Sequence, residues 1–121
     1  MKLKTIVKAH TTVEEIAADK KIGTHLAYWL AKFIAATQSD TDFYVEELKK
    51  IIEKYNATVH DDGGIEVGAE HRDKFLNAVE ALQNTDAQDP GIRFSLSELS
   101  SELKMSLQQM YPLLDFIDEE K

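Results

Sequence analysis

The segment that decides the fold is "IGTHLAYWLAKFIAATQSDTDFYVEELKKIIEKY", residues 22–55. Apolar residues and threonines recur in it at steps of three or four, which is the spacing of one helix face. These positions are Ile22, Leu26, Leu30, Phe33, Thr37, Thr41, Tyr44, Leu48, Ile51 and Tyr55. Neither Gly nor Pro interrupts "TQSDTD", residues 37–42, so we favour one continuous helix over a second helix capped at Ser39, Asp40 or Thr41.

Such a helix would be roughly 50 Å long at 1.5 Å per residue. That is more than a compact domain of this size covers along its whole length. Part of the apolar helix face is therefore expected to meet a protein partner or a second copy of the chain. Trp29, Phe33, Phe43 and Tyr44 widen this face, and we expect them to serve packing rather than a ligand site.

The stretch after the long helix reads as a β-hairpin followed by a helix. "ATVH" and "IEV" are β-prone, and "DDGG" between them supplies residues that tolerate the positive φ of tight turns. In "AEHRDKFLNAVEALQN", residues 69–84, the side chains of Phe75, Val79 and Leu82 share one face. This spacing predicts a helix of about four turns.

At the N-terminus, Lys2 to Lys8 alternate in polarity, which predicts a short edge strand with lysines that discourage edge pairing. Leu3, and also Ile6 and Val7, would point inward. In "TTVEEIAADKK", residues 11–21, Thr11 with Glu14 or Thr12 with Glu15 has the spacing of a capping box. A short helix is therefore expected to begin there and end near Lys21.

The C-terminal third predicts a strand and two helices. "GIRFSL" alternates, with Ile92, Phe94 and Leu96 on one side, and Ser95 with Glu98 is placed to cap a short helix. Ser106 with Gln109 resembles a second capping box, opening a helix that Pro112 kinks or delays. The buried face of that helix is expected at Leu107, Met110, Leu114 and Ile117, and the acidic tail, residues 118–121, is expected to fray.

Together these segments predict a single α+β domain over residues 1–121. It is mostly helical, with the long helix packed on a small sheet. We expect that sheet to combine the N-terminal strand, the hairpin and the "IRFSL" strand.

Composition excludes several functions. The chain has no cysteine, so disulfides, thiolate nucleophiles and cysteine zinc sites are excluded. The net charge is −8, and the acidic bulk argues against nucleic-acid binding. Residues 1–35 carry six basic and three acidic side chains, against eight and nineteen in residues 36–121. This difference suits head-to-tail association or a basic end that meets an acidic partner. With neither a membrane span nor a signal peptide in the pattern, we expect no membrane contact and a cytoplasmic location.

Sequence motifs that indicate catalysis, nucleotide binding or metal binding are scarce. The chain lacks the phosphate-binding loop, the dinucleotide fingerprint, the HExxH zinc motif, the GxSxG elbow and the spacing of a calcium loop. The remaining candidate is a metal site in the hairpin region, formed by His60, Asp61, Asp62, Glu66, Glu70 and His71. We interpret these as turn residues, because pairing across the hairpin leaves His71 on another element.

We assign no catalytic, cofactor-binding or metal-binding residue. His10 and His25 are isolated in the sequence and are expected to be packed or surface histidines. The serines Ser95, Ser97, Ser100 and Ser101 are best explained as caps.

The order of these segments resembles a group of small uncharacterised proteins encoded by phages and prophages of Gram-positive bacteria. The pieces that carry the resemblance are "MKLKTIV", "THLAYWLAKFIAAT", "VEELKKIIEKYNATVHDDGGIEV", "HRDKFLNAVEAL" and "IRFSLSELSSELKMSLQQMYPLLDFI". Nearly the whole chain is covered, and Pro112 departs from the pattern. The resemblance implies a phage or prophage setting, with a role in virion assembly or an accessory role, and it carries over no catalytic residue.

The leading hypothesis is therefore a non-enzymatic interaction or assembly protein of phage or prophage origin, cytoplasmic or virion-associated, which acts through the apolar face of the long helix. One alternative is a small metal-dependent enzyme centred on His60. Another is an acidic inhibitor that imitates nucleic acid.

Overall fold

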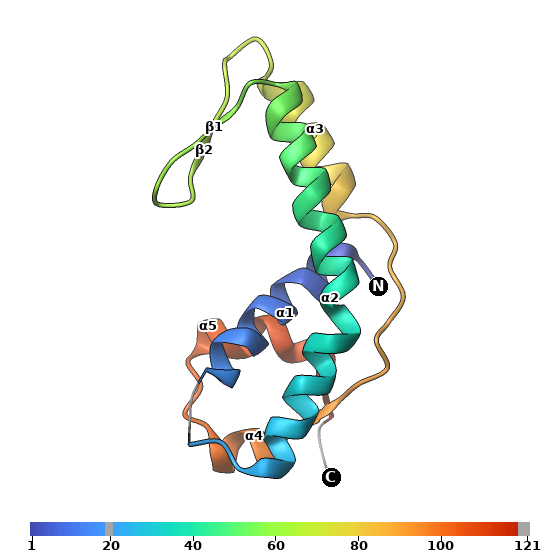
Figure 1. The fold of residues 1–121 in the computed structure, drawn as a ribbon, viewed down its shortest axis with the longest axis vertical. Coiled ribbons are helices and arrows are strands. Elements are labelled where there is room, and N and C mark those ends of the chain that lie inside the picture. The colour runs from blue at the N-terminus through green and yellow to red at the C-terminus, as the bar shows by residue number, and fades with distance from the viewer. Residues whose placement is uncertain (19–20, 119–121) are drawn as a thin grey trace.

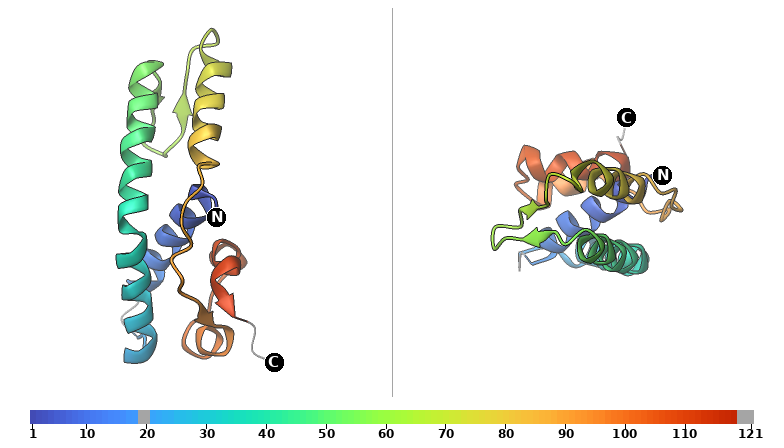
Figure 2. Two further views of the ribbon diagram at one scale, coloured as in Figure 1. Left: turned by 90° about the vertical axis from the view of Figure 1, so that its right-hand side faces the viewer. Right: turned by 90° about the horizontal axis from the view of Figure 1, so that it is seen from above.

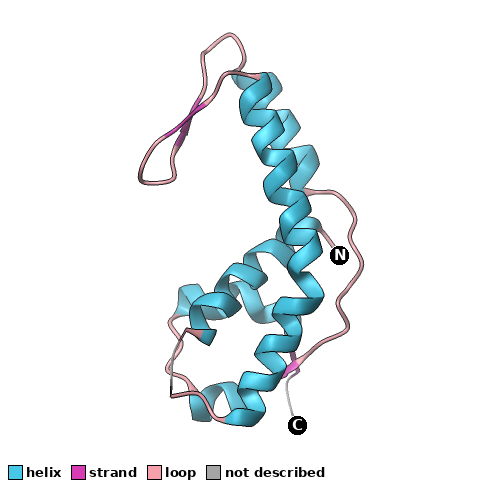
Figure 3. Cartoon of the chain, in the orientation of Figure 1, coloured by secondary structure: helices cyan, strands magenta, loops and turns pink. Residues whose placement is uncertain are grey.

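The computed structural model describes residues 1–18 and 21–118, and it shows a mostly helical α+β protein (Figures 1 and 3). This class was predicted correctly from the sequence. The elements in chain order are α1 (Leu3–Ala17), α2 (Thr24–Lys54), β1 (Thr58–Val59), β2 (Ile65–Glu66), α3 (Arg72–Gln83), β3 (Phe94–Ser95), α4 (Leu96–Glu102), α5 (Leu107–Met110), the 3-10 helix η1 (Tyr111–Phe116) and β4 (Ile117–Asp118).

Helix α2 is continuous, as predicted. At its polar midpoint the hydroxyls of Thr37 and Thr41 donate to the carbonyls of Phe33 and Thr37, at 2.7 and 2.9 Å. These residues therefore bond within the helix instead of capping a new one. Figure 2 shows α2 along one edge of the molecule, with the other helices on a single side of it.

Helix α1 replaces the predicted N-terminal strand, so that prediction was wrong. Only Lys2 makes a β-bridge, to Asp86. The helix buries its apolar face at Leu3, Ile6, Ala9, Val13 and Ile16. The predicted capping boxes at Thr11 and Thr12 are also absent, because both residues lie inside α1, where the Thr11 hydroxyl donates to the carbonyl of Val7 at 3.1 Å.

The core lies between α1, the first half of α2 and the C-terminal segment. Leu26, Leu30 and Phe33 of α2 are at most 1% exposed. The Phe33 ring lies 5.4 Å from that of Phe94 in β3 and 5.0 Å from that of Phe116 in η1. Three segments that are distant in sequence therefore meet at one aromatic cluster.

The strands form two separate pairs instead of the single sheet that was expected. The hairpin is confirmed: β1 and β2 are antiparallel, with Val59 opposite Ile65. Its turn places Gly63 at a φ of 86°, which a glycine adopts without strain. The other pair is parallel and joins β3 to β4, with Phe94 beside Ile117.

The C-terminal segment differs from the expected helix. The Ser95 and Ser106 caps form as predicted, but α5 ends at Met110 and the chain continues as η1, with Pro112 in its first turn. This change of helix type rotates the buried face. Leu113 and Phe116 are fully buried, whereas Leu107 and Leu114, predicted to be buried, are 77% and 54% exposed. Of the expected acidic tail, residues 119–121 lie outside the described residues.

Beyond the core, the second half of α2, the hairpin and α3 form a projection that we call the arm, residues 44–83 (Figure 1). Tyr55 at the end of α2 makes an edge contact with Phe75 of α3, with ring centroids 6.2 Å apart. Phe75 and Leu82 are the buried residues of α3. The arm is only two helices thick, so its apolar residues are covered from few sides.

Candidate interaction surface

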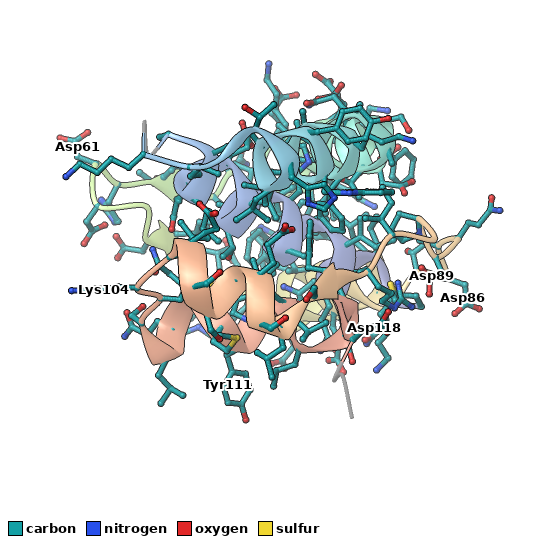
Figure 4. All side chains as sticks on the ribbon, turned by 90° about the horizontal axis from the view of Figure 1, so that it is seen from below. Asp61, Asp86, Asp89, Lys104, Tyr111 and Asp118 are labelled. Atoms are coloured by element: carbon teal, nitrogen blue, oxygen red, sulfur yellow. The ribbon has the colours of Figure 1, made fainter. Side chains whose placement is uncertain are left out.

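The hairpin brings together two of the six candidate metal ligands. His60 Nε2 lies 3.0 Å from Glu66 Oε2, and both side chains are at least half exposed. His71 contacts its neighbour Glu70 instead, at 3.6 Å. Asp62 accepts a hydrogen bond from the amide of Gly64 within the turn, and Asp61 projects into solvent (Figure 4).

Four of the six candidate ligands therefore form two separate pairs, His60 with Glu66 and His71 with Glu70. Within residues 1–18 and 21–118, no group of three or more His, Cys, Asp or Glu side chains is placed to hold a metal ion. The turn interpretation accounts for Gly63 by its positive φ and for Gly64 and Asp62 by their hydrogen bond.

The two histidines that looked isolated in the sequence both have partners. His10 is 1% exposed, and its Nδ1 lies 2.8 Å from the Thr37 hydroxyl. His25 is exposed on α2 and pairs with Glu98 of α4. Glu102 of α4 also accepts a hydrogen bond from the amide of Gly23 at 3.0 Å. Both histidines thus serve to join helices.

The serines of the α4 region are mostly explained by local bonds. Ser95 accepts from the amide of Glu98, and its hydroxyl lies 2.9 Å from that of Ser97. Ser101 donates to the carbonyl of Glu98 at 3.1 Å. Ser95 is therefore the cap that the sequence predicts, whereas Ser97, Ser100 and Ser101, also expected to be caps, lie within α4.

The apolar stripe that defined α2 is not a free surface over its first half. Leu26, Leu30, Phe33 and Thr37 are buried in the core, and Trp29 is partly buried against it. From Tyr44 to Tyr55 the stripe is half-buried beside α3. A partner therefore cannot use the whole stripe that the sequence suggested.

A second line of residues on α2 is covered only in part, and we call it the α2 seam. It shares Thr41 and Leu48 with the stripe, and these two residues, Ile34 and Ile52 are half-buried. Its members recur at alternating steps of four and three along nearly the whole helix, and none of them is buried: Ala27, Ala31, Ile34, Gln38, Thr41, Val45, Leu48 and Ile52. Alternating steps of four and three are the spacing at which two helices pack side by side over a long distance.

At its core end the α2 seam borders an apolar groove. The groove is lined by Ala17 and Ile22 together with Ala27, Leu30, Ala31 and Ile34, and has a volume of about 290 Å³. Every lining residue is apolar. At the arm end of the seam, Val45 is 56% exposed.

Further apolar side chains are exposed elsewhere on the arm. Val59 and Ile65 of the hairpin are 55% and 41% exposed, and Leu76 of α3 is 54% exposed. Phe43, just below the arm, is 48% exposed, so its expected packing role is not fulfilled within the chain. Single exposed apolar residues are ordinary, but an array along one projection points to an interaction surface.

The α2 seam was not predicted from the sequence, because the stripe beside it holds larger apolar residues and was taken as the apolar face of the helix. The available signal was the regular spacing from Ala27 to Ile52. This spacing indicates a second apolar face only when the stripe is known to be buried.

Searches with the chain find no matching family model, no similar curated protein and no similar solved structure. No described helix is both long enough and apolar enough to cross a membrane.

Proposed function

We propose that the protein is a non-enzymatic interaction or assembly protein that binds a protein surface through α2. The observation that carries the proposal is the α2 seam, which runs from the core to the arm with no buried member. A helix of 31 residues that is covered by its own chain on one side offers a long, nearly straight docking edge.

The non-enzymatic part of the proposal is supported by the exposed, pairwise arrangement of the hairpin acids and histidines and by the lack of a catalytic motif in the sequence. The phage or prophage setting is supported by the resemblance in segment order described above. In that setting, an assembly or accessory role suits a small acidic protein with a projecting arm. Phage structural genes beside its own gene would support this setting, and their absence would count against it.

The test uses one residue on the α2 seam and one on the other side of the helix. Ala31 and Ala36 are both exposed alanines of α2. They lie about 140° apart around the helix axis at 3.6 residues per turn. Ala31→Glu places a charge on the seam, whereas Ala36→Glu places the same charge away from it.

Molar mass is measured by light scattering over a range of protein concentrations, with circular dichroism to check folding. We expect the wild type and Ala36→Glu to associate, and Ala31→Glu to associate at least about tenfold more weakly because a charge would be buried unpaired. Equal association of the two variants would contradict a role for the seam. A wild type that stays monomeric would restrict the proposal to a different protein partner.

A further inference from the structure

We propose that the α2 seam pairs with the same seam of a second copy, antiparallel, about a two-fold axis near residues 39 and 40. This inference rests on the proposed function and names its partner. Three features of the seam and its surroundings favour this occupant and this orientation.

The first feature is side-chain size along the α2 seam. In an antiparallel pair centred between residues 39 and 40, residues whose numbers sum to 79 face each other. Ala27 then meets Ile52 of the other copy, and Ala31 meets Leu48. The two outer layers therefore combine a small with a large side chain, and in the layer between them and the polar centre Ile34 meets Val45.

A parallel pair would match the ends differently. Ala27 would meet Ala27 and Ile52 would meet Ile52, leaving space at one end and crowding at the other. Both defects destabilise an apolar interface. The size gradient therefore selects the antiparallel orientation.

The second feature is the polar centre of the seam. Gln38 and Thr41 are its polar members, and the antiparallel pairing places Gln38 of each copy opposite Thr41 of the other. Within one chain the Gln38 amide donates to Asp42 Oδ1 at 2.9 Å, which holds it at the helix surface. A polar layer at the two-fold axis fixes register, because a shift by one heptad would set polar groups against apolar ones.

The third feature is charge. Residues 1–39 hold six basic and three acidic side chains, +3, whereas residues 40–83 hold five basic and eleven acidic, −6. Antiparallel pairing lays the first half of α2 in one copy, with Lys21 just before it and Lys32 within it, along the acidic arm of the other. Of the acidic C-terminal segment, α4 contacts only the start of α2, where Glu98 pairs with His25 and Glu102 accepts from the amide of Gly23.

The test exploits the lack of cysteine in the chain, because single introduced cysteines then report specific contacts. We would prepare Ala27→Cys and Ile52→Cys, mix them in equal amounts and oxidise them with a glutathione buffer. The mixture should give a disulfide-linked dimer much faster than either variant alone. The matched control is Ala27→Cys mixed with Val45→Cys, whose positions would be offset by seven residues, about 10 Å. That distance is beyond the reach of a disulfide bond.

Three results would overturn the inference. Rapid cross-linking of Ala27→Cys alone would indicate a parallel pair. A dimer seen by light scattering that cross-links in neither mixture would indicate another surface, and would leave the proposed function standing. A chain that is monomeric at every concentration would exclude the paired seam, and the proposed function would then depend on a partner of another sequence.

Discussion

His10 shows at the scale of one residue how α1 is attached to α2. The Thr37 hydroxyl donates to the carbonyl of Phe33 at 2.7 Å and lies 2.8 Å from His10 Nδ1. The other ring nitrogen lies 3.0 Å from Glu14 Oε1. A buried polar side chain is tolerated here because both nitrogens have partners.

Removing that partner should destabilise the fold. In Thr37→Val the imidazole loses its hydrogen-bond partner inside the core, and we expect the free energy of unfolding to fall by about 1–3 kcal/mol. Urea denaturation at one protein concentration, the same for every variant, measures this. Thr11→Val is the matched control, because Thr11 also donates to a carbonyl four residues earlier but is exposed. A loss no larger than that of the control would show that the buried bond contributes nothing.

The ion pair between Asp89 and Arg93 makes a second residue-scale prediction. The hydrogen bond from Arg93, helped by the amide of Gly91, lowers the pKa of Asp89 from 3.8 to about 2. Because the pKa is lower in the folded state, the unfolded chain binds the proton first as pH falls. The stabilisation is therefore complete above about pH 4 and is lost between about pH 4 and 2.

Asp89→Asn should flatten the decline in stability over that pH range. The effect at neutral pH should stay below about 1 kcal/mol, because the pair is partly exposed to solvent. Urea denaturation at several pH values measures it, with Asp86→Asn as a nearby exposed control. If the stability of Asp89→Asn declines with falling pH as steeply as that of the wild type, the ion pair does not stabilise the fold.

At the scale of elements, the arm should unfold more readily than the core. Its helix pair has only Phe75 and Leu82 buried on the α3 side, whereas α1 is buried against several elements. Regions with few buried contacts open separately from the whole molecule.

Phe75→Ala should increase amide hydrogen exchange in α3 and in the second half of α2 while leaving α1 largely protected. The expected local loss is about 2–4 kcal/mol, at or below the usual range for a buried Phe because the arm is thin. Leu76→Ala is the control, since its side chain is 54% exposed. Equal acceleration in α1 would show that the arm and the core unfold as one unit.

Two elements were predicted wrongly from the sequence, the N-terminal strand and the C-terminal helix. Lys2 to Lys8 holds too few apolar residues to distinguish alternation from helical spacing, and only the burial of Ala9, His10 and Val13 shows that one helix face continues through it. In the C-terminal segment, Pro112 was recognised as a disturbance. The resulting 3-10 turn was not, so the buried face was placed on the wrong leucines.

At the scale of the whole molecule, the antiparallel pair would give a salt-dependent dimer. The attraction between the basic N-terminal part of one copy and the acidic arm of the other is screened by ions. We expect the dissociation constant of the dimer to rise roughly three- to tenfold between about 50 and 500 mM sodium chloride. Light scattering at fixed concentrations measures this change, and a dimer that strengthens with salt would indicate a purely apolar interface in another orientation.

The α2 seam, as a candidate interaction surface, could be predicted from the sequence only in part. The sequence showed that α2 is too long for its own domain, and the structure places its excess length in the arm. The sequence could not show which face of α2 the chain keeps for itself. Once α1 covers the stripe through Leu26 and Phe33, the seam through Ala27 and Val45 becomes the face left to a partner.

The sequence by itself determined the parts that depend on near neighbours: the continuous α2, the hairpin turn at Gly63, helix α3 and the serine caps at Ser95 and Ser106. Their hydrogen bonds close within a few residues, so local spacing and turn chemistry suffice to predict them. Only the tertiary structure decided that the N-terminus is helical, that Phe94 pairs with Ile117 and that α2 buries one face and exposes the other. Those outcomes depend on segments that are distant in the chain and meet only in the folded core, where burial outweighs local preference.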